Sequence, residues 1–167
     1  WCEDVHTNAK TKASNVIRFT TKTDARAGYG RIRRVYIMAD FDWNQFPNFS
    51  ASEFRCQHTG TDGMDEDFVK CLQQLRTMYG KGMVISSGYR SAEHPIEARK
   101  PNGPGAHESG KAADIAIYGA DALELLTLAV QSGLFTGIGV AQKGSLGSRF
   151  LHLDTLKGGN RPTIWSY

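Results

Sequence analysis

The sequence predicts an α+β fold with a small, largely antiparallel sheet flanked by helices. Apolar residues recur at helical spacing in two stretches, while several shorter stretches have the apolar patterning of strands. These stretches do not follow one another as regular βαβ units, which disfavours a parallel, doubly wound sheet. A chain of 167 residues is long enough to bury a real core and most simply forms one main domain.

The first 48 residues are predicted to form an accessory segment. Residues 16–22 and 31–38 have strand patterning and are joined by a turn-rich stretch, which predicts a β-hairpin before the main body at residues 49–167. Three arginines lie in the second strand, and base-stacking aromatic residues are not interleaved with them in the manner of a known module, so solvated strand positions are a simpler interpretation than a nucleic-acid surface. The three are Arg31, Arg33 and Arg34.

A first long helix is predicted over residues 65–79. Its apolar residues recur every three or four positions, and Gly80 is well placed to end it. Cys71 lies in this pattern and is interpreted as a small buried apolar residue. The chain has three cysteines and no CxxC pair, so a thiolate zinc site is disfavoured, while a disulfide between two of them stays open.

The remaining elements are a second helix, a long loop and four strands. The helix is predicted to run to Gly133 from Asp121, which has the spacing of a capping box with Glu124. Residues 89–111 contain three prolines and several glycines and are predicted to form one loop, of a length that often carries function. The strands are predicted at residues 83–87, 112–117, 137–141 and 149–155, the first short and buried and the last two a closing pair.

Composition places the chain among ordinary soluble proteins. It has 40% hydrophobic and 22% charged residues, and no apolar run reaches the roughly 18–20 residues that a membrane span needs. The net charge of +3 suits an anionic partner such as a bacterial cell wall or nucleic acid, but it is equally common in proteins with neither. We therefore expect no membrane or nucleic-acid partner. Nothing in the sequence indicates an oligomeric state.

The most informative residues are His107, Asp114 and His152. All three lie among small or apolar residues, where a polar side chain is costly unless it has a partner. Two imidazoles and one carboxylate, with a fourth position left for water, form the ligand set of a catalytic zinc site. A structural zinc more often takes four ligands and prefers cysteine. The sequence therefore predicts a zinc hydrolase with these three residues as metal ligands.

Alternation along the last predicted strand places another carboxylate near this site. Side chains two apart in a strand share a face, so Phe150, His152 and Asp154 point one way. Leu151 and Leu153 point the other way and are expected to pack on the core. Asp154 is therefore expected to face the same cleft as His152.

Three motifs together resemble the zinc D-Ala-D-Ala carboxypeptidase family. This family includes peptidoglycan endopeptidases of phages, and its fold is shared by the hedgehog signalling domain. The resemblance runs from Phe49 to Tyr167, and its opening stretch is similar to the phage and bacterial branch. The three motifs are Ser87-Gly-Tyr-Arg90-Ser, His107-x-x-Gly-Lys-Ala-Ala-Asp114 and His152-Leu-Asp154.

The resemblance implies a hedgehog-like metallopeptidase fold, zinc on the three ligands named above, and a role for Arg90. In this role Arg90 binds the substrate and the developing oxyanion, because a guanidinium beside a polarised carbonyl stabilises charge that appears only in the transition state. From the residues alone, a surface salt bridge from Arg90 to Glu93 or Glu97 stays open.

The chain departs from the family pattern at two positions. Gly105 stands where the family usually has serine, which affects local support more than metal binding. Arg149 stands where many relatives have the acidic general base, and an arginine cannot accept a proton from water. Asp154 is then either the base or the partner that orients a histidine ligand, and the sequence leaves both roles open. Glu108 is a weaker candidate for the base.

The resemblance thus implies zinc-dependent hydrolysis of D-amino-acid-containing stem peptides in the peptidoglycan of a bacterial cell wall, by a carboxypeptidase or an endopeptidase. Zinc would activate water and polarise the carbonyl, Asp154 would accept the proton, and Arg90 would hold the oxyanion. Two alternatives stay open. One is a zinc-binding module of the same fold without hydrolysis, which Arg149 favours. The other is a structural component of a phage or virus particle, attached through residues 1–48.

Overall fold

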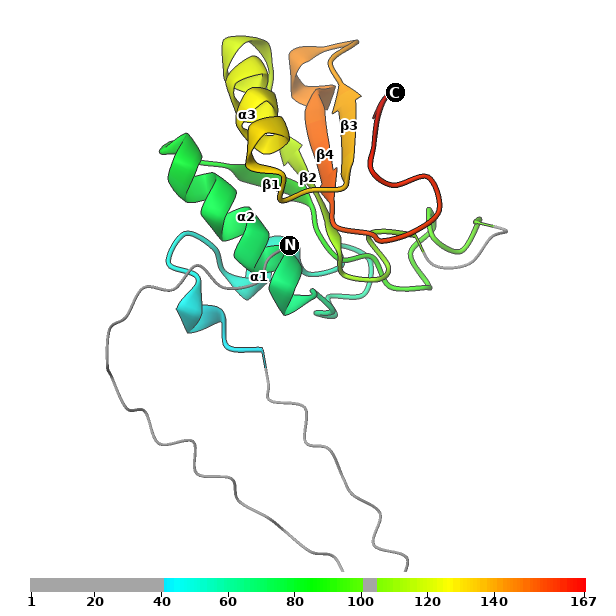
Figure 1. The fold of residues 1–167 in the computed structure, drawn as a ribbon. Coiled ribbons are helices and arrows are strands. Elements are labelled where there is room, and N and C mark those ends of the chain that lie inside the picture. The colour runs from blue at the N-terminus through cyan, green and yellow to red at the C-terminus, as the bar shows by residue number, and fades with distance from the viewer. Residues whose placement is uncertain (1–40, 101–104) are drawn as a thin grey trace, which may run out of the picture. The chain divides into compact units, whose positions relative to one another are not determined.

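The computed structural model describes residues 41–100 and 105–167, which form the predicted α+β fold (Figure 1). Five strands make one sheet in the order β1-β2-β4-β3-β5, and all neighbours are antiparallel except β3 and β5. The strands are β1 (Val84–Ser87), β2 (Ala112–Ala116), β3 (Gly137–Ala141), β4 (Phe150–Asp154) and β5 (Thr163–Ser166). The helices are α1 (Ala51–Phe54), α2 (Glu66–Tyr79) and α3 (Gly119–Ser132), with 3-10 turns η1 (Trp43–Gln45) and η2 (Leu146–Ser148).

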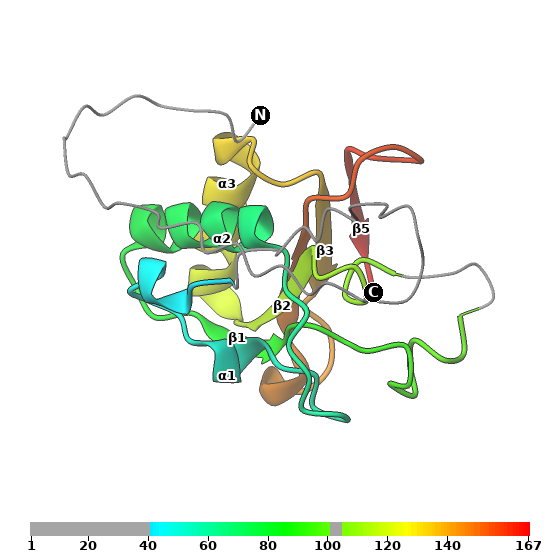
Figure 2. The same cartoon turned by 90° about the horizontal axis from the view of Figure 1, so that it is seen from below.

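The two faces of the sheet differ because side chains alternate along its strands. Leu151 and Leu153 of β4 point into the core and are almost fully buried, as predicted. The helices α2 and α3 lie on this same side of the sheet (Figures 1 and 2). His152 and Asp154 point to the opposite side, so one face holds the apolar core and the other is available for polar chemistry.

The helix α2 has the predicted boundaries. The carboxylate of Asp65 accepts a hydrogen bond from the amide of Phe68 at 3.0 Å and so caps the first turn. Gly80 ends the helix in the left-handed conformation that glycine adopts most readily. Cys71 is buried in this helix, as predicted, but it is disulfide-bonded rather than a free apolar side chain, whereas Cys56 is a buried free thiol.

The capping box predicted at Asp121 and Glu124 is wrong. The helix α3 already begins at Gly119, with Tyr118 as its N-cap, so both acidic residues lie within the helix. Their carboxylates accept hydrogen bonds from the Lys81 ammonium at 2.8 and 2.6 Å. The two acidic residues therefore pair with a lysine in the segment before β1 and do not cap the N-terminus of the helix.

The strand β1 is an edge strand, not the buried one that was predicted. Val84 is 67% exposed, because β1 pairs only with β2 within the described sheet. The register between the two strands shifts between Ile85 and Ser87. Such an irregularity re-aims side chains and is common beside functional sites.

The N-terminal segment is described only from Phe41. The predicted hairpin at residues 16–22 and 31–38 lies outside the described residues, so the accessory segment and its boundary at residue 48 stay predictions. Phe46 belongs to the core, and Phe41 and Trp43 pack against it. Among the residues that the structure describes, no helix is long and apolar enough to cross a membrane.

Candidate metal centre

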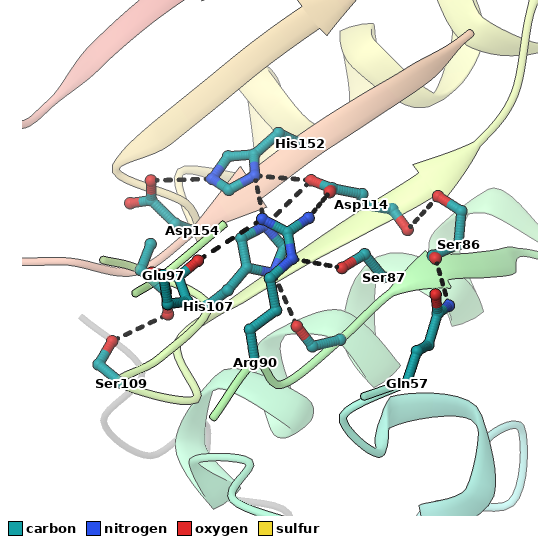
Figure 3. A network of polar contacts seen from close by, with 12 residues as sticks. Gln57, Ser86, Ser87, Arg90, Glu97, His107, Ser109, Asp114, His152 and Asp154 are labelled. Carbon is teal, nitrogen blue, oxygen red and sulfur yellow. Dashed lines mark hydrogen bonds and ion pairs between the residues drawn. The ribbon is translucent and has the colours of Figure 1, made fainter. Parts of the chain in front are cut away.

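Two neighbouring strands and one loop bring the three predicted ligands together. Asp114 in β2 lies directly opposite His152 in β4, so the two side chains leave the sheet as neighbours on its polar face. His107 joins them from the loop before β2. All three residues are at least 94% buried, and Figure 3 shows their side chains pointing toward one another.

Main-chain contacts fix the loop that carries His107. Its Nδ1 donates a hydrogen bond to the carbonyl of Gly88 at 2.7 Å, and the amide of Arg90 donates to the carbonyl of His107 at 3.3 Å. Gly110 follows with a φ of 73°, in the region that glycine enters without strain. A Cβ at Gly110 would also lie 2.1 Å from the carbonyl oxygen of Gly63. The loop therefore holds its histidine in one place.

The three candidate ligand atoms lie close together, at distances somewhat shorter than those that a bound cation would set. His107 Nε2 is 3.2 Å from Asp114 Oδ1 and 3.2 Å from His152 Nδ1. His152 Nδ1 is 2.8 Å from the same carboxylate oxygen. Zinc bonds of about 2.0–2.2 Å in a tetrahedral site put ligand atoms about 3.3–3.6 Å apart, only slightly more than these distances.

The protonation of the two imidazoles leaves a lone pair on each facing nitrogen. A carbonyl cannot donate, so His107 Nδ1 carries the proton in its bond to Gly88, and Nε2 is free to act as an acceptor. His152 Nε2 faces the carboxylate of Asp154 at 3.3 Å and donates to it, which frees Nδ1 in the same way. Three lone pairs then converge on one point, an arrangement that needs a positive charge at its centre.

The electrostatics of the site favour that charge. Burial alone would raise the pKa of Asp114, but the hydrogen bonds that His107 and His152 donate when their facing nitrogens are protonated hold that pKa well below the usual range. A proton on His152 Nδ1 is the alternative to a cation: burial opposes it, yet hydrogen bonds with Asp114 and Asp154 raise the pKa of His152, so a proton and a metal ion compete for this nitrogen. The carboxylate therefore stays ionised, and the buried centre attracts a cation.

The guanidinium of Arg90 lies beside the centre, in a side chain that is 15% exposed. Its Nη2 donates to Asp114 Oδ2 at 2.8 Å, the oxygen that the histidines do not contact, and its Nε donates to Ser87 Oγ at 2.9 Å. The register shift before Ser87 places this hydroxyl on the polar face. The salt bridge to Glu97 that the sequence left open does exist, at 3.7 Å from Nη1, but it is buried rather than on the surface.

The peptidase M15 family model matches residues 47–154, a range that spans the three ligand residues and Arg90. This match covers more than half of the chain. The chain belongs to the peptidase M15 family. It is a metallopeptidase with a His-Asp-His site, and its substrate is a peptide. The comparison with curated proteins gives no match.

In this M15 domain Asp154 lies behind His152, away from the facing ligand atoms. Its Oδ2 accepts from His152 Nε2 and from Arg161 Nη2 at 2.7 Å. Its Oδ1 accepts from Arg161 Nε at 3.0 Å and from the Leu156 amide at 3.2 Å. Burial opposes its ionisation, but these bonds lower the pKa of Asp154 to about 2. Both carboxylate oxygens of Asp154 thus accept hydrogen bonds, and its side chain has no exposed surface.

The two departures from the family pattern have structural counterparts in this M15 domain. A Cβ at Gly105 would lie 2.2 Å from Lys100 Nζ and 3.0 Å from Glu97 Oε2, so the glycine leaves room for the 2.6 Å ion pair between these residues. Arg149 bonds to the carbonyl of Gly144 through Nε and Nη2 on the exposed surface. It therefore does not take part in the polar network around the ligands.

Glycines in β3 make room for the side chains on the polar face. A Cβ at Gly137 would lie 2.2–2.5 Å from the carboxylate of Asp154, and one at Gly139 would lie 2.8–2.9 Å from the rings of Trp165 and Tyr167. Sequence reasoning missed this role, and it also missed Arg161. The signal that was available is the pair of glycines two apart in a strand, which share one face.

Replacing Asp154 by asparagine in the M15 domain is expected to weaken metal binding about 10- to 100-fold, because the partner that fixes the His152 tautomer loses its charge. The measurement is a competition titration against a chelator of known affinity. Asp121→Asn is the matched control, since Asp121 pairs with exposed Lys81 and lies outside the group of residues able to share one ion, so metal affinity should stay unchanged. Equal affinities in the two variants would contradict the role of Asp154.

Replacing Gly137 by alanine is expected to lower the free energy of unfolding by about 1–3 kcal/mol, because the new methyl group must displace the Asp154 carboxylate. Urea denaturation measures this change. Gly147→Ala is the control, since a Cβ there meets nothing within 4 Å and its effect should stay within about 1 kcal/mol. A Gly137→Ala protein as stable as the control would show that the space between β3 and the Asp154 carboxylate accommodates a methyl group.

Proposed function

We propose that this M15 domain uses zinc to hydrolyse peptide bonds in peptidoglycan stem peptides that contain D-amino acids. The observation that carries the proposal is the convergence of three lone pairs, from His107 Nε2, His152 Nδ1 and Asp114 Oδ1, at mutual distances of 2.8–3.2 Å. Such a set is costly to bury without a cation. Its composition of two imidazoles and one carboxylate is the one that catalytic zinc sites use.

Zinc is the cation that best suits this donor set. Nitrogen and carboxylate ligands in a set of three are typical of catalytic zinc, whereas magnesium and calcium prefer oxygen ligands. When bound, zinc lowers the pKa of a water molecule and polarises a carbonyl group. The rest of the chemistry depends on the side chains around the three ligands.

Arg90 is proposed to stabilise the oxyanion. Its Nη2 and Nε are held by Asp114 and Ser87, which fixes the plane of the guanidinium, while Nη1 makes only the 3.7 Å contact with Glu97. A guanidinium held in advance beside a developing negative charge needs little reorganisation during the reaction. This arrangement supports the role that the family resemblance implied.

Of the two roles left open for Asp154, its contacts support the orientation of His152. A general base must reach the proton that it accepts, and this carboxylate is fully buried behind the imidazole, with both oxygens bonded. Its fixed charge strengthens the donor character of His152 Nδ1 toward a metal. We therefore propose Asp154 as a positioning residue of the metal centre.

A non-catalytic zinc module of the same fold is the second candidate function. It is favoured by Arg149, which stands in place of the usual acidic base and lies on the exposed surface. In that case the domain would bind zinc tightly and would leave peptidoglycan intact.

One experiment separates the two candidates. The zinc content of the purified protein is measured by mass spectrometry, and the turbidity of purified peptidoglycan is then followed with and without a chelator. We expect about one zinc per chain, loss of turbidity and its arrest by the chelator. Mass spectrometry of the released peptides identifies the bond that is cut. Bound zinc without any released peptide supports the non-catalytic module, and protein without zinc overturns the metal centre itself.

A further inference from the structure

We propose that Trp165 and Tyr167 form a substrate-binding wall on one side of the metal centre. This aromatic wall would receive the small aliphatic residue next to the cleaved bond, and the Tyr167 hydroxyl would donate a hydrogen bond to a main-chain carbonyl of the peptide. The inference rests on the proposed function, because it names how the peptide substrate is held.

The register of the sheet places the aromatic wall next to the ligands. Asp114 pairs with His152, His152 with Gly139, and Gly139 with Trp165, so one row of residues crosses β2, β4, β3 and β5. The Trp165 ring lies 5.3 Å from the His152 ring. The amide of Tyr167 donates to the carbonyl of Val140, which continues the pairing of β5 with β3 by one further residue.

The missing side chain at Gly139 allows both rings to lie over β3. Any Cβ at this position would come within 2.9 Å of Trp165 and Tyr167. Tyr167 packs 5.1 Å from the ring of Phe150, which shares a face of β4 with His152. The aromatic wall therefore lies on the same face as the metal centre, beyond His152 on the side away from Asp114.

The exposed parts of these two rings point to the chemistry of the ligand. Tyr167 is 56% exposed, although its ring also packs against that of Phe150. A phenol is protonated at neutral pH and burial raises the pKa of this one further, so its hydroxyl can donate a hydrogen bond. Aromatic rings offer apolar contact at a low cost in conformational entropy, and a phenol adds one directional hydrogen bond.

The charge around the aromatic wall favours an uncharged residue. The guanidinium of Arg161 lies 5.0 Å from the centroid of the Trp165 ring, but Asp154 already neutralises it through two hydrogen bonds. On the opposite side of the centre, the charge of Arg90 remains, with its Nη1 in the 3.7 Å ion pair to Glu97. The site is thus polar on the β2 side and apolar on the β5 side. A peptide with a small apolar residue at the aromatic wall matches this asymmetry.

The test uses a non-hydrolysable ligand, a phosphinate analogue of alanyl-alanine, bound to the zinc-loaded full chain and measured by calorimetry. Tyr167→Phe removes only the hydroxyl and is expected to weaken binding about 2- to 12-fold, the range for one neutral hydrogen bond. Tyr167→Ala also removes the ring and is expected to weaken binding more than tenfold. Ile164→Ala is the matched control, because Ile164 is an exposed residue of the same strand that alternates to the other face.

Zinc affinity and KM are measured for the same variants. The aromatic wall is supported if both Tyr167 variants keep the zinc affinity of the wild type, bind the analogue more weakly and have a higher KM for stem peptides. The changes in binding and in KM should be smaller for Tyr167→Phe than for Tyr167→Ala. Tyr167→Ala and Ile164→Ala proteins that bind the analogue equally would overturn the aromatic wall while leaving the proposed function intact. A Tyr167→Phe protein with reduced zinc affinity would overturn it as well, since the phenol would then serve the metal centre. A wild-type protein that neither binds the analogue nor cleaves peptidoglycan overturns the proposed function, and the aromatic wall with it.

Discussion

Replacement of His107 by alanine is expected to remove the metal and the peptidase activity together. The variant keeps only two of three converging ligands, so metal affinity should fall by more than about 100-fold, beyond the loss typical of a supporting residue. Activity on peptidoglycan should fall on the order of 10³-fold or more, because the loss of a Lewis acid removes several kcal/mol of transition-state stabilisation. Metal content by mass spectrometry and release of soluble peptides measure the two effects.

The control for this variant is His58→Ala. His58 is exposed and lies outside the group of residues able to share one ion, so its loss should change neither metal content nor activity. Circular dichroism checks that both variants are folded. A folded His107→Ala protein that retains its zinc would show that the convergence of His107, Asp114 and His152 is not the metal centre.

Replacement of Arg90 by alanine is expected to lower kcat about 10²- to 10³-fold at saturating zinc, the range seen when one oxyanion-stabilising donor is removed. The protein should still bind zinc, because Arg90 contacts only Oδ2 of Asp114 and none of the three facing ligand atoms. Steady-state kinetics on soluble stem peptides give kcat and KM separately.

Arg149→Ala is the matched control for Arg90. Both are arginines of the same domain, but the Arg149 guanidinium bonds to the carbonyl of Gly144 on the surface. We expect its kcat to stay within about twofold of the wild type, as is usual for surface substitutions away from special features. A similar loss in the two variants would indicate a general effect of positive charge on binding to an anionic cell wall rather than a role in the reaction.

The sequence predicted those parts of the structure that depend on local patterns. The alternation of Phe150, His152 and Asp154 with leucines placed the ligand and the core on opposite faces of β4, and the structure confirms this arrangement. The helix over residues 65–79 was predicted with its correct end, since a helical period followed by glycine is a strong local signal.

The parts that depend on distant contacts were not predictable from the same patterns. The burial expected for β1 was wrong because the position of a strand within a sheet is set by pairing, not by its own four residues. Asp154 could be assigned to the correct face of β4 from the alternation alone. Its two hydrogen bonds from Arg161 could not be predicted, because they depend on a turn that brings a residue seven positions later back to the strand. Gly137 and Gly139 carried a signal that becomes meaningful only when the neighbouring strands are known.

The hydrogen bonds from Arg161 to Asp154 also show that the candidate site extends beyond the residues that the family match covers. The family match ends at residue 154, at the last residue of β4. A fragment cut there would keep every metal ligand and would still be recognised as a member of the family. It would lose the guanidinium that neutralises the Asp154 carboxylate, and it would lose Trp165 beside His152. The stretch of sequence that identifies the family is therefore shorter than the stretch that builds the proposed site.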